Sequence, residues 1–234
     1  VQAALLPTKL PKRLKGVDVH ASFSAALELG GDFYDYLVPE SNTLIIALGD
    51  VSGKGVPAAL YSVFAGELVR GRTFRRRYVP ERSSPAAVLM SINTILHERK
   101  LEEYYCTLCY AIFDLKRKMV TLSNSGLPYP VRATADECRL IEAPGVPLGS
   151  FSGMTYDEVS LPLSSGDVFV FCSDGVTEAM NRQSDEFGSE RLLDIVASTK
   201  HLTAKEIIDS IVEAVDAHRD GFPRNDDTTV VALK

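Results

Sequence analysis

The stretch LGDVSGKGVPAALYS, residues 48–62, joins an apolar run to a helical pattern through a loop with three glycines. Such loops often hold a phosphate group, because the backbone N–H groups at a helix N-terminus attract anions. The phosphate-binding loop of nucleotide enzymes, however, reads G-x-x-x-x-G-K-[ST]. Here Gly49 and Gly53 are one residue too close, and Gly55 stands where Ser or Thr is needed. Asp50 adds a negative charge, so this loop is better suited to bind a cation.

The whole chain has the composition of a globular protein. Of its 234 residues 45% are hydrophobic, which is enough for a buried core. The net charge of −6 argues against a general nucleic-acid binder. The longest apolar runs, such as LIIAL and VFVFC, are far shorter than the roughly 18 residues of a membrane span. We therefore expect a cytoplasmic protein, or a cytoplasmic domain of a larger sensor protein, with no nucleic-acid partner and no membrane span in this chain.

Periodic patterns predict an α+β fold. Strands are expected where apolar residues alternate or run on, at 17–25, 43–50, 104–115, 118–125, 129–134, 156–163, 167–175 and 228–234. Helices are expected at 57–72, 85–98, 188–199 and 202–218. In the first helix Leu60, Phe64 and Leu68 would form the buried stripe. Because strands and helices come in blocks, we expect antiparallel sheets with segregated helices, and the strands between 104 and 134 should form one meander.

Two of the expected helices begin with capping signals. Ser84 can cap the second helix, with Pro85 at its first position. Thr203 and Glu206 have the spacing of a capping box at the start of the last helix.

The cysteines do not form a metal or redox site. Cys106 and Cys109 have CxxC spacing, but residues three apart on an expected strand point to opposite faces. We therefore expect buried, reduced thiols. No cysteine is followed by arginine six residues later, so the sequence lacks the C-x₅-R site of the cysteine phosphatases.

Five arginines lie between residues 70 and 77. They belong either to a solvated loop between two helices or to a patch that docks an acidic partner. In the second case Arg75, Arg76 and Arg77 would contact the substrate.

Acidic residues recur at the ends of the expected strands. The motifs are GGDFYD with Asp32 and Asp35, LGDVSGKG with Asp50, FCSDGVTEA with Asp174 and Glu178, and RNDDTTVV with Asp226 and Asp227. A single Asp-Gly is usually a turn, but four such sites converge if their strands are neighbours. Two carboxylates about 5 Å apart repel by roughly 3 kcal/mol at an effective dielectric constant of about 20, so a cation must lie between them. Oxygen ligands without histidine or thiolate favour Mg²⁺ or Mn²⁺.

Five motifs in order resemble those of the SpoIIE/RsbU-type phosphatases, bacterial members of the PP2C-like, metal-dependent serine/threonine protein phosphatases (PPM). They are ELGGDFYDYL, LGDVSGKGVPAAL, GVPLG, CSDGVTEAMN and NDDTTVVALK. The resemblance covers the chain from about Leu5 to Lys234. It implies that residues 1–15 are the end of an upstream linker or helix and that residues 16–234 form one phosphatase domain. It further implies an α-β-β-α sandwich, in which helices flank two antiparallel sheets.

The resemblance also implies a centre of two Mn²⁺ or Mg²⁺ ions. Carried over by position, Asp50 would bridge both ions, and the backbone carbonyl of Val51 would bind one of them. Asp174 and Asp226 would be the other direct ligands. Asp50, Asp174 and Asp226 would thus act in catalysis through metal-bound water, since two ions about 3.5–4 Å apart can activate water for in-line attack on a phosphoryl group.

Five further positions match the family motifs with weaker or indirect roles. Asp32 would contribute to the metal centre directly or through water, and Asp227 is a weaker candidate for a ligand. Gly31, Gly53 and Gly55 would shape the backbone around the centre.

The usual substrate of such phosphatases is a phosphorylated STAS-domain anti-anti-sigma factor, which controls a sigma factor by partner switching in bacterial stress responses. The helices at 57–72 and 85–98 resemble the family's regulatory switch region, which implies an upstream sensor or activator and a possible homodimer.

The sequence departs from the family pattern at one position, and two alternative functions stay open. Leu127, in NSGLPYP, stands where many members have histidine, which leaves any substrate contact at that position undetermined. A phosphatase fold that only binds a partner is the main alternative, although it usually lacks a ligand aspartate. A diguanylate cyclase is a weaker alternative, because GGDFYD departs from the motif GG[DE]EF at Tyr34 and Asp35.

Overall fold

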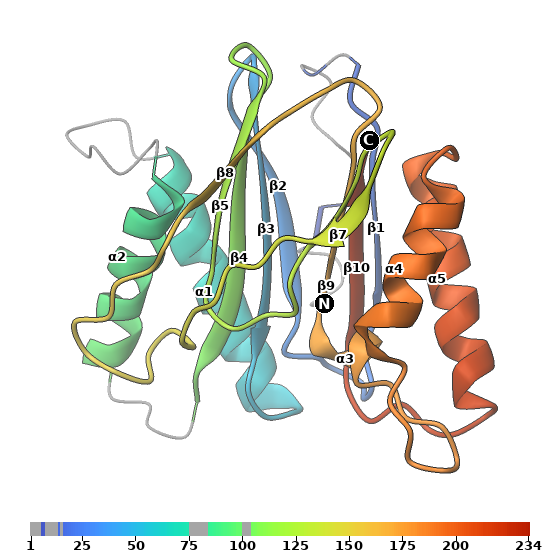
Figure 1. Cartoon of the computed structure of the whole chain (residues 1–234). Coiled ribbons are helices and arrows are strands. Elements are labelled where there is room, and N and C mark those ends of the chain that lie inside the picture. Colours follow the sequence, from blue (N-terminus) through green and yellow to red (C-terminus); the bar gives the residue numbers. More distant parts are fainter. Residues whose placement is uncertain (1–5, 8–13, 15, 75–83, 100–103) are drawn as a thin grey trace. The chain divides into compact units, whose positions relative to one another are not determined.

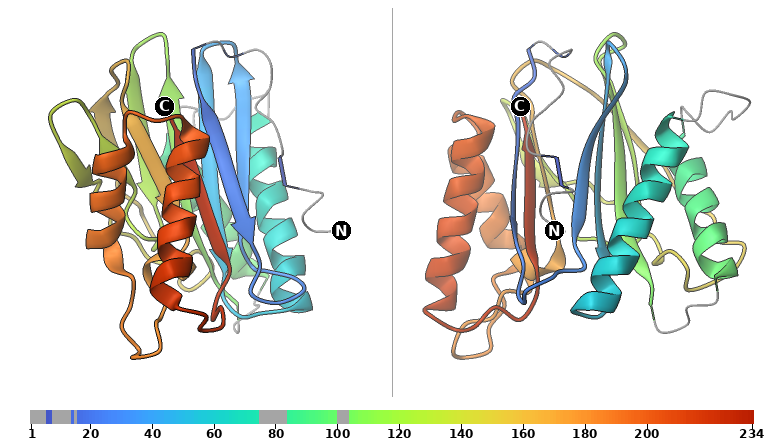
Figure 2. Two further views of the ribbon diagram at one scale, coloured as in Figure 1. Left: turned by 90° about the vertical axis from the view of Figure 1, so that its right-hand side faces the viewer. Right: turned by 180° about the vertical axis from the view of Figure 1, so that it is seen from behind.

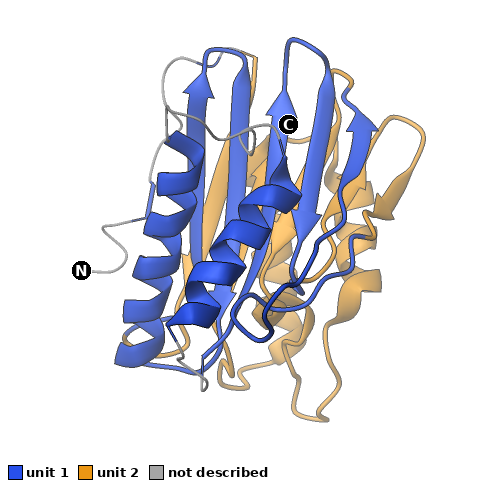
Figure 3. Ribbon diagram, turned by 90° about the vertical axis from the view of Figure 1, so that its left-hand side faces the viewer, with its two compact units in different colours: residues 1–15, 29–127, 143–163 blue, residues 16–28, 128–142, 164–234 orange. Residues whose placement is uncertain are grey.

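The computed structural model describes residues 6, 7, 14, 16–74, 84–99 and 104–234. The chain divides into two compact units (Figure 3). Unit 1 comprises Val1–Lys15, Leu29–Leu127 and Ala143–Leu163, and unit 2 comprises Gly16–Glu28, Pro128–Glu142 and Ser164–Lys234. Neither unit is a continuous piece of chain. The division into a linker at 1–15 and one domain at 16–234 therefore stays a prediction.

Unit 1 contains a five-stranded antiparallel sheet in the order β2-β3-β4-β5-β8, covered on one face by two helices (Figure 1 and Figure 2). Its elements are β2 Phe33–Glu40, β3 Thr43–Val51, α1 Val56–Phe74, α2 Pro85–Glu98, β4 Cys106–Asp114, β5 Met119–Asn124 and β8 Val159–Pro162. Buried side chains of both helices and of the sheet, among them Phe33, Ala65, Leu89 and Tyr110, form one apolar core. This core fixes α1 against β2 and β3.

Unit 2 contains a second five-stranded antiparallel sheet, in the order β1-β10-β9-β6-β7. Its elements are β1 Val19–Ser24, β6 Val131–Ala133, β7 Cys138–Leu140, β9 Val168–Cys172, α3 Asp174–Thr177, α4 Gly188–Thr199, α5 Ala204–Arg219 and β10 Thr228–Leu233. Helices α4 and α5 lie side by side on one face of this sheet (Figure 1 and Figure 2). The apolar core between these helices and the sheet includes Val170, Ile208, Ile211 and Val230.

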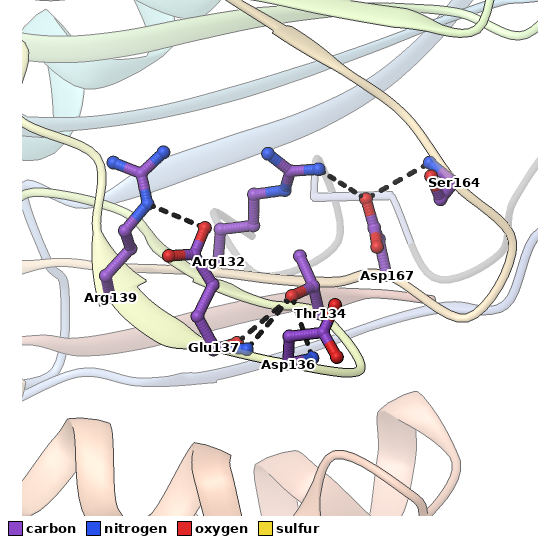
Figure 4. Close-up of polar contacts among 7 residues, drawn as sticks. All are labelled: Arg132, Thr134, Asp136, Glu137, Arg139, Ser164 and Asp167. Carbon is purple, nitrogen blue, oxygen red and sulfur yellow. Dashed lines mark hydrogen bonds and ion pairs between the residues drawn. The ribbon is translucent and has the colours of Figure 1, made fainter.

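A buried ion pair ties β6 to the start of β9 in unit 2 (Figure 4). Nη2 of Arg132 donates to Oδ2 of Asp167 at 2.8 Å, and both side chains are buried. The backbone N–H of Ser164 donates to the same oxygen at 3.1 Å. Arg139 and Glu137, which form a neighbouring pair on the β6–β7 hairpin, are exposed.

The predicted α+β class is confirmed: the chain contains two antiparallel sheets with flanking helices. The capping signals are confirmed as well. Oγ of Ser84 accepts from the N–H of Ala87 at 3.1 Å, and Thr203 and Glu206 each accept a hydrogen bond from the other's backbone N–H. In the described part of the chain, no helix is both long and apolar enough to cross a membrane.

The expected meander is wrong at its last strand. β4 and β5 are paired neighbours in unit 1, but β6 pairs with β7 and β9 in unit 2. The chain leaves the first sheet at Gly126, whose φ of 105° lies in the region that favours glycine. Apolar periodicity identifies a strand but not its partner. Strands β2 and β7 and the short helix α3 were not among the predicted elements, and the strand expected at 167–175 ends at Cys172.

The predicted buried stripe of α1 is confirmed only in part, because Phe64 and Leu68 pack against the core and Leu60 does not. Leu60 is 67% exposed, and Phe64 and Leu68 are only partly buried. The helix instead turns Ala58 and Ala65, which are seven residues apart, toward the sheet. Tyr61 and Val69 are buried in the same core, whereas Leu60 lies on the outer face of the helix.

Candidate functional site

In unit 1, the Asp50 carboxylate and the Val51 carbonyl lie beside the glycine pair that precedes β2. A β-carbon on Gly31 would clash with the carbonyl oxygen of Val51 and would lie 3.3 Å from Oδ1 of Asp50. Both oxygens therefore lie close to the Gly31 backbone, with the Val51 carbonyl at a distance that only glycine allows. Asp32, the next residue, is 1% exposed. These residues form an oxygen-lined cradle.

The loop after β3 is held against the strand next to it. The N–H of Ser52 donates to the carbonyl of Tyr105 at 3.0 Å, and the N–H of Tyr105 donates to Oγ of Ser52 at 2.9 Å. Gly53 and Gly55 have φ angles of 88° and 76°, which glycine adopts without strain. The carbonyl of Gly55 accepts the N–H of Ala59 in the first turn of α1. The loop thus connects Asp50 rigidly to the start of a helix.

The thiols near this loop are unsuited to nucleophilic attack. Burial raises the pKa of Cys106 well above its usual value, and the carboxylates of Asp50 and Asp32 raise it further. Burial alone raises the pKa of Cys109 to about 12. All four cysteines are free, so the expectation of reduced thiols is confirmed. At neutral pH Cys106 and Cys109 are protonated, and a thiolate is the reactive form.

In unit 2, the end of β9 and the start of β10 meet at a second close contact. Oγ of Ser173 accepts from the N–H of Thr229 at 3.0 Å and donates to the carbonyl of Asp227 at 3.3 Å. A β-carbon on Gly175 would clash with that same carbonyl oxygen and would lie 3.3 Å from the carbonyl carbon of Asp226. Only glycine fits there, and Asp174, which precedes it, therefore lies near the Asp226–Asp227 pair.

The two adjacent aspartates of unit 2 differ in their surroundings. Oδ1 of Asp227 accepts from the N–H of Ala26 at 2.8 Å, and the Asp227 side chain is buried. Oδ1 of Asp226 accepts from the N–H of Asp227 at 2.9 Å. Asp226 and Asp174 are half-buried. One oxygen of Asp227 therefore anchors the segment after β1, whereas the half-buried Asp226 is more accessible to solvent than Asp227.

The donors of both units fit a hard divalent cation by their chemistry. They are the carboxylates of Asp32 and Asp50 and the carbonyl of Val51 in unit 1, and the carboxylates of Asp174 and Asp226 in unit 2. All are oxygen atoms, the ligands that Mg²⁺ and Mn²⁺ prefer. Among the residues described, no three or more His, Cys, Asp or Glu side chains gather as a metal ion would require. The full ligand set therefore stays a prediction.

The arginine-rich segment is not simply a loop. Arg70 and Arg72 belong to α1. Nε of Arg70 lies 2.7 Å from Oδ2 of the buried Asp35 carboxylate, which joins α1 to β2. Burial raises the pKa of Asp35, and Arg70 opposes that shift. Arg75, Arg76 and Arg77, the predicted docking residues, lie outside the described residues.

Leu127, which replaces the usual histidine, fills an apolar position in unit 1. Its side chain is buried. The side chain of Asn124 donates to the Leu127 carbonyl at 2.8 Å and accepts from its N–H at 3.1 Å. The loop is therefore held by Asn124 through backbone atoms, which any residue at 127 would supply.

Sequence patterns missed two arginines of unit 2. Arg219 and Arg224 line a small hollow together with Gly175, Glu178 and Asp226. Arg224 is the first residue of the motif RNDDTTVV, in which only the aspartates are predicted site residues, and Arg219 lies at the end of a helix outside the motifs.

Comparisons with known proteins identify the fold and the family of this chain. The solved structure of the SiaA-PP2C domain of Pseudomonas aeruginosa superposes with a TM-score of 0.85 at 20% identity, over 100% of this chain and 92% of that one. The fold is therefore that of a PP2C-type domain. The family model for stage II sporulation protein E (SpoIIE) matches residues 40–234. The chain belongs to this family of PP2C-type serine phosphatases, which are metal-dependent enzymes.

Curated relatives are longer than this chain. Protein IcfG of Synechocystis sp. is 28% identical over 100% of this chain, which spans 40% of IcfG. Phosphoserine phosphatase RsbU of Bacillus subtilis is also 28% identical over 100% of this chain, which spans 68% of RsbU.

Proposed function

We propose that this chain hydrolyses phosphoserine or phosphothreonine monoesters on a bacterial regulatory protein. Its family membership and the phosphoserine phosphatase activity in the name of RsbU support a phosphoprotein substrate. The five ordered motifs support the finer proposal that the substrate is a cytoplasmic, phosphorylated STAS-domain anti-anti-sigma factor. Dephosphorylation would then release a sigma factor through partner switching.

The observation that carries this proposal is the glycine contact in unit 1. Gly31 lets the backbone pack directly against the carbonyl of Val51 and close to the carboxylate of Asp50, which supports two oxygen ligands side by side. The proposed ligands of two Mn²⁺ or Mg²⁺ ions are Asp32, Asp50, Val51, Asp174 and Asp226, with Asp227 as a weaker candidate. When bound, the ions would neutralise phosphoryl oxygens and activate water for in-line attack.

The chain's own residues orient these ligands. Gly31 and Gly175 allow close backbone approach beside the proposed ligands. Ser173 holds the ends of β9 and β10 together next to Asp174. The protonated Cys106 and Cys109 thiols take no part in attack on phosphorus.

Regulation would reach the site through α1. This helix begins directly after the Asp50 loop, and its Arg70 binds Asp35 of β2, three residues beyond Asp32. A displacement of α1 would therefore move both groups of ligands in unit 1. We propose that an upstream sensor, or a second copy in a homodimer, acts on the enzyme through this helix.

The test is release of inorganic phosphate from a phosphorylated STAS-domain protein and from a phosphoserine peptide. Turnover should require Mn²⁺ or Mg²⁺ and stop in EDTA. Asp50→Asn should abolish most of it, whereas Asp136→Asn, an exposed turn residue, should not. Full turnover by metal-stripped protein would refute the metal-dependent reaction. Equal rates on unrelated phosphoproteins would refute the STAS assignment alone.

A further inference from the structure

Two arginines of unit 2 share one carboxylate at the edge of a hollow. Nη1 of Arg219, at the end of α5, lies 3.5 Å from Oδ1 of Asp216, and Nη2 of Arg224 lies 3.4 Å from the same oxygen. Both distances are long for a charge-assisted hydrogen bond, which is about 2.7–2.9 Å. Asp216 thus holds two guanidinium groups close together but forms only a long ion pair with each of them.

Because both arginine side chains are largely buried, holding two positive charges side by side here costs free energy. The Arg219 side chain is only 9% exposed and that of Arg224 29% exposed. Burial lowers the pKa of Arg219, and the charge of Arg224 lowers it further. Like charges repel each other in a partly desolvated place, and the single charge of Asp216 offsets only part of this repulsion.

The hollow that both arginines line also contains Asp226, a proposed metal ligand, and Glu178. An anion bound by the arginines would therefore lie next to the proposed reaction centre. A guanidinium group binds the paired oxygens of phosphate or carboxylate through two parallel N–H groups, which makes arginine better suited than lysine to this task.

We propose that Arg219 and Arg224 form an oxyanion-binding subsite that holds the phosphoprotein substrate at the catalytic centre. This inference rests on the proposed function. The oxyanion is either the phosphoryl group itself or an acidic side chain beside the phosphoserine, since both present the same oxygen geometry. Asp216 acts as a positioning residue that keeps the two guanidinium groups together.

Arg224→Gln tests the subsite, because Arg224 is the more exposed of the two arginines and lies outside regular structure. Arg182→Gln is the matched control: it removes the same charge from an exposed arginine of unit 2, whose Nε donates to the carbonyl of Asp220. The substrates are a phosphoserine peptide with flanking Asp and Glu, the same peptide with Asn and Gln, and p-nitrophenyl phosphate, all in Mn²⁺.

The expected result is a rise of about 10-fold in KM for the acidic phosphopeptide, equivalent to about 1.4 kcal/mol, with partial rescue by Arg224→Lys. If the subsite holds the phosphoryl group, KM rises equally for all three substrates. If it holds an acidic side chain, the neutral peptide and p-nitrophenyl phosphate are unaffected. The proposal is overturned if Arg224→Gln changes KM no more than Arg182→Gln does with every substrate.

Binding of a phosphonate peptide, which cannot be hydrolysed, separates this inference from the proposed function. Calorimetry in Mn²⁺ should show the same loss of about 10-fold in affinity for Arg224→Gln, even if the chain turned over no phosphoprotein. Arg219→Lys, with its melting temperature measured alongside, provides a second variant of the buried arginine. Unchanged affinity in both well-folded variants refutes the subsite.

Discussion

Replacing Gly31 by alanine should disable the candidate metal centre and leave both sheets folded. The new β-carbon would lie closer than 3.0 Å to the Val51 carbonyl oxygen, whereas ordinary contact begins at 3.4 Å. The carbonyl and the neighbouring Asp50 must therefore move by several tenths of an ångström. A displacement of about 1 Å at a catalytic group can cost about 100-fold in rate, so we expect a fall of at least about 10-fold in kcat/KM.

The assay combines phosphate release with a Mn²⁺ titration. In Gly31→Ala the Mn²⁺ concentration for half-maximal activity should rise, and overpacking should cost about 1–3 kcal/mol of stability. Gly71→Ala is the control: it lies in α1 with no atom within 4 Å of the added carbon. That change should stabilise the helix by about 0.5–1 kcal/mol with unchanged activity. If Mn²⁺ dependence and kcat/KM are unaltered in Gly31→Ala, the oxygens of Asp50 and Val51 beside Gly31 are not part of a metal site.

Two further predictions concern unit 2. Asp167→Asn should lower the free energy of unfolding by about 3–5 kcal/mol, because it removes the buried negative charge with which the Arg132 guanidinium pairs at 2.8 Å. Glu137→Gln, which removes the exposed ion pair with Arg139 on the β6–β7 hairpin, should lower the free energy of unfolding by at most about 1 kcal/mol. Equal losses of unfolding free energy for the two variants in urea denaturation would contradict this reasoning. Cys172→Ser should keep its turnover per folded molecule within about two-fold, since no thiol takes part in the reaction. Complete loss of activity in a well-folded Cys172→Ser protein would point to a thiol mechanism.

Local sequence signals predicted the helices well, because their starts depend on neighbouring residues. The caps at Ser84 and Thr203 are local hydrogen bonds that spacing alone reveals. The buried face of α1 was not predictable in this way. Its outer face carries Leu60, and its inner face carries Ala58 and Ala65 beside Tyr61 and Val69, so a four-residue apolar repeat does not by itself define the buried side. Which strands pair with each other also depends on residues far apart in the sequence, and for this reason the pairing of β6 was predicted wrongly.

The candidate site shows the same contrast. The aspartates and glycines could be predicted because they occur as short motifs at strand ends. Gly31 shows why glycine is needed there, since its neighbours Asp50 and Val51 lie about twenty residues further along the chain and approach it only in the fold. Arg219 and Arg224 could not be predicted, because their common partner and their burial depend on how α5 ends.

The most direct test of the central claim compares melting temperatures of wild type and Asp174→Asn, each with and without Mn²⁺. Without metal, Asp174→Asn should melt no lower than wild type, because it removes one of several like charges at the strand ends. Metal at about 100 times its Kd adds about 2.7 kcal/mol to the native state, and each kcal/mol is worth roughly 2–4 °C at this size. Wild type should therefore gain about 5–10 °C from Mn²⁺ and the variant clearly less. If metal-free Asp174→Asn melts well below metal-free wild type, or if both proteins gain equally from Mn²⁺, Asp174 is a structural turn residue and not a metal ligand.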